Sequence, residues 1–132
     1  SALHVYGNGR QSRCFLHVSD VVGALIGLIE HPGAVGEVFN IGSQEEVTIE
    51  DLAKRIIAAT RSRSAIERVA YEDAYEEGFE DMARRVPDIG KVKALTGFAP
   101  SRTLDQIITS VVESMQPALD ATARLCEAAA RG

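Results

Sequence analysis

The chain has 132 residues, which fits one domain, and its 45% hydrophobic and 25% charged residues are typical of a globular protein. The formal net charge is −5, from 14 Lys and Arg against 19 Asp and Glu, and this argues against nonspecific binding to nucleic acid, which needs a basic face. The longest apolar run, residues 21–29, is too short to span a bilayer, so no membrane partner is expected.

The first thirty residues predict a hairpin followed by a helix. Residues 3–6 and 13–18 have the composition of short strands, and the Gly-Asn-Gly sequence at 7–9 between them indicates a turn. Residues 3–18 are therefore expected to form a β-hairpin. A helix should occupy residues 20–30, capped by Ser19 or Asp20 and ended by the His-Pro-Gly sequence that follows.

The middle of the chain alternates between strand and helix patterns. Residues 37–41, Glu-Val-Phe-Asn-Ile, predict a compact strand that Gly42 closes. Thr48 is the expected N-cap of a helix over residues 49–60, because acidic side chains follow it in the positive first turn. Residues 65–71 predict another strand.

The last part of the chain predicts a loop and two helices. Residues 72–87 show little periodicity and are expected to form a loop, which at this length is often functional. Asp88 should cap a short helix that stops at Gly97. A longer helix should start at Thr103, and Pro117 should break or kink it because proline lacks the N–H that the helix needs.

The cysteines and histidines indicate neither disulfides nor metal. Cys14 and Cys126 are far apart, without a C-x-x-C motif, so a reduced cytoplasmic setting is expected. The three histidines have no metal-ligand spacing, so no metal site is predicted from them.

Two arginine clusters could carry chemistry. Arg13 lies in a predicted strand made largely of apolar residues, where it either reaches solvent or faces an anion, since its planar fork matches phosphate oxygens. Gln11 lies two residues earlier and would share its strand face. Arg84 and Arg85 precede a predicted helix and could bind phosphate as well, or they could be solvated partners of nearby acidic residues.

Several motifs together resemble one family. They are residues 7–15 (GNGRQSRCF), 18–20 (V-x-D), 36–42 (GEVFNIG), 48–53 (TIEDLA), 85–89 (R-x-P-D-I) and 97–100 (G-F-x-P). In this order and spacing, from residue 3 to about residue 114, they resemble the second half of extended short-chain dehydrogenases/reductases that act on sugar nucleotides. The resemblance is closest to UDP-glucuronate decarboxylases and UDP-glucose 4-epimerases.

The resemblance implies a role for each site residue. Arg13 would contact the diphosphate or the nucleotide, Arg85 would face the substrate phosphates, and Gln11 would lie beside the nucleotide ribose and base. Phe79 would lie near the nucleotide or sugar, where some relatives carry a tyrosine. Asp20 would cap a helix rather than bind the ligand, and residues 39–42 would join the sheet of the cofactor domain.

The resemblance also implies what this chain leaves to another part of the protein. The sequence has neither a Gly-x-x-Gly-x-x-Gly turn nor a Tyr-x-x-x-Lys pair, so no catalytic or cofactor-binding residue is predicted in it. NAD and the acid/base Tyr would belong to a missing N-terminal NAD-binding domain. Residues 1–132 would then be a small α/β C-terminal substrate-binding domain, with short strands, about four to five helices and no Rossmann half.

Two other interpretations stay open. The chain could be a non-enzymatic module that binds a sugar nucleotide or another phosphate ligand by itself. It could instead be an oligomerisation domain in which both arginines are solvated. A homo-oligomer is expected for the separated domain, because a chain without its cofactor half would expose strand edges and aliphatic surface.

Overall fold

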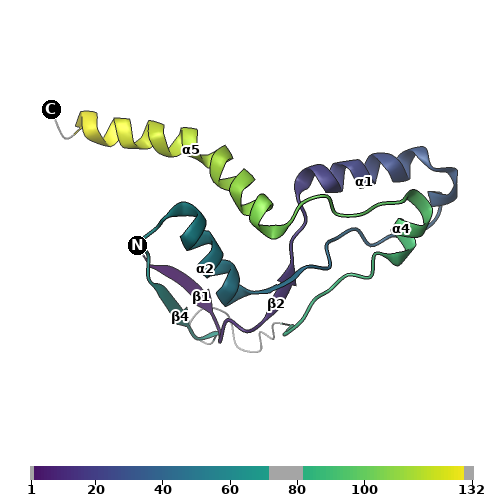
Figure 1. Ribbon diagram of the computed structural model, residues 1–132, viewed down its shortest axis with the longest axis horizontal. Helices are drawn as coiled ribbons and strands as arrows, with labels where there is room; N and C mark the ends of the chain where they lie inside the picture. The colour runs from purple at the N-terminus through teal and green to yellow at the C-terminus, as the bar shows by residue number, and fades with distance from the viewer. Residues whose placement is uncertain (1, 72–81, 130–132) are drawn as a thin grey trace.

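The computed structural model describes residues 2–71 and 82–129 (Figure 1). The chain in these ranges forms short strands and four α-helices, which confirms the predicted small α/β class. In order, the elements are β1 (Leu3–Tyr6), β2 (Ser12–Cys14), α1 (Val18–Glu30), the 3-10 helix η1 (Pro32–Ala34), β3 (Glu46–Thr48), α2 (Ile49–Thr60), β4 (Ile66–Val69), α4 (Gly90–Thr96) and α5 (Leu104–Ala129).

The strands form two separate pairs, so the predicted hairpin is wrong. β1 runs parallel to β4, with Leu3 opposite Ile66, whereas β2 runs antiparallel to β3, with Arg13 opposite Val47. The turn between β1 and β2 does contain positive φ angles, but it does not fold the strands onto each other. Its carbonyls at residues 9 and 11 instead accept from the backbone N–H groups of residues 50 and 49, so the chain passes over the start of α2 into the other sheet.

The predicted helix capping is confirmed for α2 and wrong for α1. Thr48 Oγ1 accepts from the backbone N–H of Asp51 at 3.1 Å, as its sequence position predicts. At α1 the N-cap is His17, whose Nδ1 lies 3.1 Å from the Ser19 backbone nitrogen. The Asp20 carboxylate accepts from both the backbone N–H and the hydroxyl of Ser101 instead, and these bonds lower the pKa of Asp20.

The two C-terminal helices follow the sequence pattern with one difference. Asp88 is not the N-cap of α4; its Oδ1 accepts from the Gly90 backbone N–H at 2.8 Å, and Ile89 occupies the cap position. Gly97 ends α4 at a φ of 75°, as predicted. Of the two effects predicted for Pro117, a break does not occur, because α5 continues as one helix; the helix does change direction partway along in Figure 1.

The main core lies where α2 and α5 meet the β2–β3 pair. Val47, Leu104 and Ile108 are its buried centre, and partly buried apolar side chains surround them: Phe15, Leu52, Ile56 and Val112. A smaller group of buried residues, Ala24, Ile89 and Val92, lies at α1 and α4. Arg13 lies opposite Val47 in the β2–β3 pair, so the strand that carries Arg13 is held beside this core.

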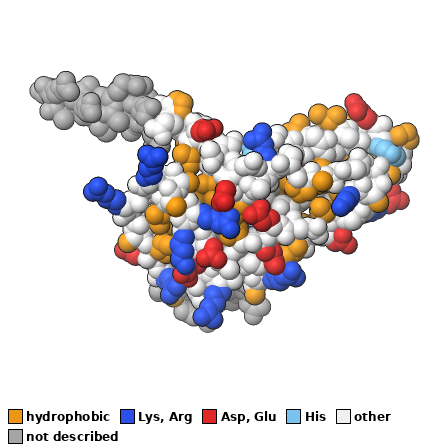
Figure 2. Space-filling view, viewed as in Figure 1, with side chains coloured by type: hydrophobic (Ala, Val, Ile, Leu, Met, Phe, Trp, Pro, Cys, Tyr) orange, Lys and Arg blue, Asp and Glu red, His pale blue; other side chains and the backbone are white. Residues whose placement is uncertain are grey.

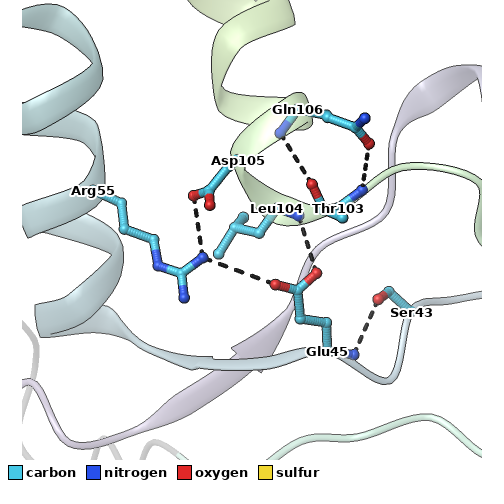
Figure 3. A network of polar contacts seen from close by, with 7 residues as sticks. All are labelled: Ser43, Glu45, Arg55, Thr103, Leu104, Asp105 and Gln106. Atoms are coloured by element: carbon cyan, nitrogen blue, oxygen red, sulfur yellow. Dashed lines mark hydrogen bonds and ion pairs between the residues drawn. The ribbon is translucent and has the colours of Figure 1, made fainter.

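A polar network attaches the start of α5 to the same core (Figure 3). The Glu45 carboxylate accepts from the Leu104 backbone N–H at 3.0 Å, so it caps a helix that begins 59 residues later in the chain. Arg55 Nη1 on α2 lies 3.8 Å from Glu45 Oε1 and 3.1 Å from Asp105 Oδ1, so one positive charge is shared between the two carboxylates. The network orients α5 on α2 with groups that are largely solvent-accessible.

The apolar stripe of α1 faces solvent. Ile29 is 83% exposed, and Val22, Leu25 and Ile26 are about half exposed. Figure 2 shows hydrophobic side chains along this helix. Over the described ranges, no helix combines the length and hydrophobicity needed to cross a bilayer.

Residues 37–41 do not form the predicted strand. Among the described residues they have no strand partner, and contacts with α4 hold them instead. Lys91 Nζ donates to Glu37 Oε2 at 2.6 Å and to the Val38 carbonyl at 2.9 Å, and it lies 4.7 Å from the centre of the Phe39 ring. A strand needs a neighbouring backbone, so the alternating pattern alone could not decide this segment.

We expect the 132-residue chain to self-associate as its concentration rises. The exposed stripe of α1 and the unpaired segment at residues 37–42 offer apolar surface and backbone hydrogen-bonding groups to a second copy. Light scattering across a concentration series should therefore show a rising mean mass. Replacing Leu25 and Ile29 by lysine should reduce that rise, and a constant monomer mass at high micromolar concentration would contradict the expectation.

Candidate functional site

A cavity of about 480 Å³ brings together segments that are far apart in the sequence. Its lining comes from β2, the extended stretch around residue 41 and the stretch that precedes α4, and Figure 1 shows the course of these three segments. Its walls combine two arginines, one carboxylate, one amide, one thiol and several apolar groups: Arg13, Cys14, Leu16, Asn40, Ile41, Gly42, Arg85, Val86, Pro87 and Asp88. Both of the arginines singled out in the sequence therefore line the same cavity.

Arg13 is half-buried and fixed in place by backbone carbonyls. Its Nη1 donates to the carbonyl oxygen of Ser12 at 2.7 Å and to that of Met82 at 2.8 Å. The second bond crosses from β2 to the segment that carries Arg85. Arg13 thus holds one wall of the cavity against the other, in addition to placing a positive charge there.

Arg84 and Arg85 have different environments although they are adjacent. Arg84 Nε donates to the Glu46 carboxylate, at 2.7 Å to Oε2 and 3.2 Å to Oε1. Arg85 is exposed, lines the cavity and has no hydrogen-bond or ion-pair partner among the described residues. The ion-pair interpretation therefore holds for Arg84, whereas anion binding by Arg85 stays a prediction.

The cavity is electropositive on balance but not uniformly so. Among the described residues, its lining contains two guanidinium groups and one carboxylate, Asp88, whose Oδ1 accepts from the Gly90 backbone N–H. Burial raises the pKa of the Cys14 thiol, and the neighbouring Glu46 carboxylate raises it further, against the effect of Arg84. Cys14 is therefore a neutral thiol at physiological pH and adds no charge to the site.

Gly42 permits the close approach of the two stretches that wall the cavity. A Cβ atom at this position would lie 2.5 Å from Pro87 Cγ and 3.2 Å from Pro87 Cβ. A proline ring cannot rotate away as a flexible side chain would, so any larger residue would push the walls apart.

Gly42→Ala should therefore lower the free energy of unfolding by about 1–3 kcal/mol, the usual cost of inserting a methyl group into a packed site. The matched control is Gly23→Ala on α1, where an added Cβ meets nothing within 4 Å and alanine should stabilise the helix by up to about 1 kcal/mol. Urea denaturation of both variants measures the difference. Equal midpoints for the two would show that the contact with Pro87 yields at no cost.

The other two predicted site residues are not placed in the cavity. Gln11 is absent from its lining, and the Gln11 side-chain amide donates to the Tyr6 carbonyl at 3.0 Å. Phe79 lies outside the described residues. Their predicted roles beside the nucleotide and sugar stay predictions.

Sequence reasoning missed several residues of the site. Asn40, Ile41 and Gly42 line the cavity, although they were expected only as part of a strand. The contact of Glu46 with Arg84 could not be predicted, because the two residues are 38 positions apart and no local pattern indicates that they meet. No group of three or more His, Cys, Asp or Glu in the described part of the chain could hold a metal ion.

The fold and the order of the motifs define the chain as a member of the extended short-chain dehydrogenases/reductases. The family model described as GDP-mannose 4,6 dehydratase matches residues 1–111, and the chain belongs to this family. The predicted family resemblance is thereby confirmed.

Individual proteins that are similar to the chain are sugar-nucleotide enzymes by name. The chain is 39% identical to UDP-N-acetyl-alpha-D-glucosaminuronate decarboxylase of Bacillus cytotoxicus over 111 residues, covering 84% of this chain and 34% of the relative. It superposes with a TM-score of 0.74 and 26% identity on UDP-glucose 4-epimerase of Thermotoga maritima solved with UDP-glucose, covering 89% of this chain and 36% of the other.

A third comparison gives the same picture. dTDP-glucose 4,6-dehydratase of Bacillus anthracis, solved in complex with NAD, superposes with a TM-score of 0.73 and 29% identity, covering 88% of this chain and 35% of the other. The chain thus spans about a third of the length of the relatives it matches.

Proposed function

We propose that residues 1–132 are the C-terminal, sugar-nucleotide-binding domain of an NAD-dependent epimerase, decarboxylase or dehydratase. The observation that carries the proposal is the convergence of Arg13 and Arg85 on one cavity. Relatives named for UDP-sugars support it, and so does the one-third coverage, which leaves room for a separate NAD-binding domain.

The cavity offers the contacts that a nucleoside diphosphate sugar needs. Two guanidinium forks can each make charge-assisted, bidentate bonds to diphosphate oxygens. Ile41 and Pro87 provide apolar wall against a base or a sugar face, and the Asn40 amide can both donate and accept. In this proposal Gln11 and Phe79 complete the nucleotide and sugar contacts.

In this proposal the reaction itself takes place with groups of the NAD-binding domain. NAD would oxidise the sugar transiently at C4, and the Tyr/Lys pair and the phosphate-binding turn that such chemistry uses are absent from this sequence. The residues of this chain would bind the substrate and orient its sugar toward the cofactor. The chain by itself is proposed to be catalytically inactive.

Titration of the 15N-labelled chain with UDP, followed by NMR, tests the proposal, since this method detects affinities down to the millimolar range. UDP should shift the backbone signals of cavity residues, chiefly those of Arg13, Gly42 and Arg85, in a saturable way. NAD at the same concentrations should leave them unchanged, and a UDP-sugar should not be converted. Micromolar NAD binding, or no UDP response at the cavity, would refute the proposal.

A further inference from the structure

The Glu46 carboxylate connects three neighbouring stretches of backbone. Glu46 lies on β3 opposite Cys14 of β2, and the other side of β2 is met by the segment that leads to α4, through the Ser12–Arg84 bridge. In that bridge the Ser12 backbone N–H donates to the Ala83 carbonyl at 2.8 Å. The carboxylate reaches across β2 to accept from Ser12 Oγ at 3.1 Å and from Arg84 Nε at 2.7 Å.

The contact lies next to the cavity but is not part of its lining. The lining contains Arg13 and Arg85 and neither Ser12 nor Arg84, whose side chains bind Glu46 instead. Each cavity arginine directly follows, along the chain, a residue that Glu46 binds. A bond beside the cavity therefore holds the backbone from which the cavity arginines extend.

We propose that Glu46 and Arg84 are positioning residues, which hold the segment of Arg85 against β2 so that Arg85 stands beside Arg13 at the phosphate site; the inference rests on the function proposed above. Arg85 has no other anchor among the described residues, whereas Arg84 is bound directly. The bond with Arg84 also lowers the pKa of Glu46, so its carboxylate is charged at neutral pH.

The substitution Glu46→Gln separates positioning from simple electrostatics by its sign. It removes a negative charge near an anion site, so Coulomb attraction alone predicts tighter binding of UDP. Positioning predicts the opposite, because without the carboxylate the Arg85 segment loses the side-chain bond from Arg84 and is held to β2 only by the bonds to the carbonyls of residues 82 and 83. We expect the Kd of UDP to rise by roughly three- to tenfold, less than loss of the arginine fork itself would cause.

The experiment is a double-mutant cycle on the full 132-residue chain, with UDP as the probe and NMR titration as the readout. Glu46→Gln is made in the wild-type background and in an Arg85→Ala background. The matched control is Glu50→Gln, which removes an equal charge from a carboxylate bound at 2.6 Å by Arg68 outside the cavity. Amide exchange at Ser12, measured without UDP, reports the backbone bond to residue 83 directly.

We expect Glu46→Gln to weaken UDP binding in the wild-type background and to cause no further weakening in the Arg85→Ala background. We also expect the Ser12 amide to exchange faster in the Glu46→Gln variant. Unchanged or tighter binding would overturn the positioning role while leaving the site intact, provided that Arg85→Ala still weakens binding. Equal weakening in both backgrounds would also overturn it, because the effect would then act through the fold. Absence of any UDP response in the wild-type chain would mean that the proposed function has failed, and the positioning role with it.

Discussion

Replacing Arg85 by alanine should weaken the binding of UDP to this chain by about ten- to a hundredfold. A charge-assisted contact between a guanidinium and a phosphate contributes roughly 1.5–3 kcal/mol, and Arg85 lines the cavity without a competing partner in the described residues. The fold should be unaffected, because the side chain is exposed and forms no hydrogen bond or ion pair with the described residues. NMR titration of the variant measures the change in Kd.

The control for Arg85 is another exposed arginine away from the cavity. Arg63→Ala removes the same charge from a side chain that is not in the cavity lining, and it should change the Kd of UDP by less than about twofold. Arg85→Lys should recover only part of the affinity, because an ammonium lacks the bidentate fork. If Arg85→Ala and Arg63→Ala weaken binding equally, net charge rather than a site explains the affinity.

Arg13→Ala should weaken UDP binding at least as strongly, but for two reasons. The variant loses a cationic fork, and it also loses the bonds from Nη1 to the carbonyls of Ser12 and Met82 that hold the cavity walls together. A loss of stability should therefore accompany the loss of affinity for this variant and not for Arg85→Ala. The different effects of the two variants on stability depend on the contacts of Arg13 with backbone carbonyls, which the sequence motifs do not predict.

Replacing Leu104 by alanine should lower the free energy of unfolding by about 2–5 kcal/mol, the usual range for a truncated core leucine. Leu104 is 3% exposed at the centre of the main core, where α5 meets α2 and the β2–β3 pair. Domains are stable by only about 5–15 kcal/mol in total, so the variant should unfold at a much lower urea concentration.

The control lies on the same helix. Val111 is 50% exposed, and Val111→Ala should change the stability by less than about 0.5 kcal/mol. Urea denaturation followed by circular dichroism compares the two midpoints. Similar midpoints would show that α5 does not carry the core of this domain, and that the placement of β2 depends on other contacts.

Local chemistry was enough to predict the helices and some of their ends. Thr48 caps α2 because its hydroxyl lies within reach of the N–H three residues on, and Gly97 stops α4 because it can adopt a positive φ. Each of these contacts spans only a few residues. The family resemblance was readable for a similar reason, since its motifs keep their order and spacing along the chain.

Strand pairing could not be predicted in the same way. Residues 3–6 and 13–18 look like the arms of a hairpin, yet β1 pairs with β4 and β2 with β3. An alternating pattern shows that a segment can be extended but not which backbone will satisfy its hydrogen bonds. The pairing depends on tertiary contacts. Here the first turn of α2 donates to carbonyls of the turn between β1 and β2, and this keeps the two strands apart.

The sequence by itself determined the class of the protein, the positions of its helices and the two arginines worth testing. Only the tertiary structure decided that Arg13 and Arg85 line one cavity, and that Arg84, one residue earlier, binds Glu46 instead. The physical reason is that the side of an extended segment facing a site depends on which strand lies beside it. Neighbouring strands come from distant parts of the chain, so local residue patterns contain no information about that choice.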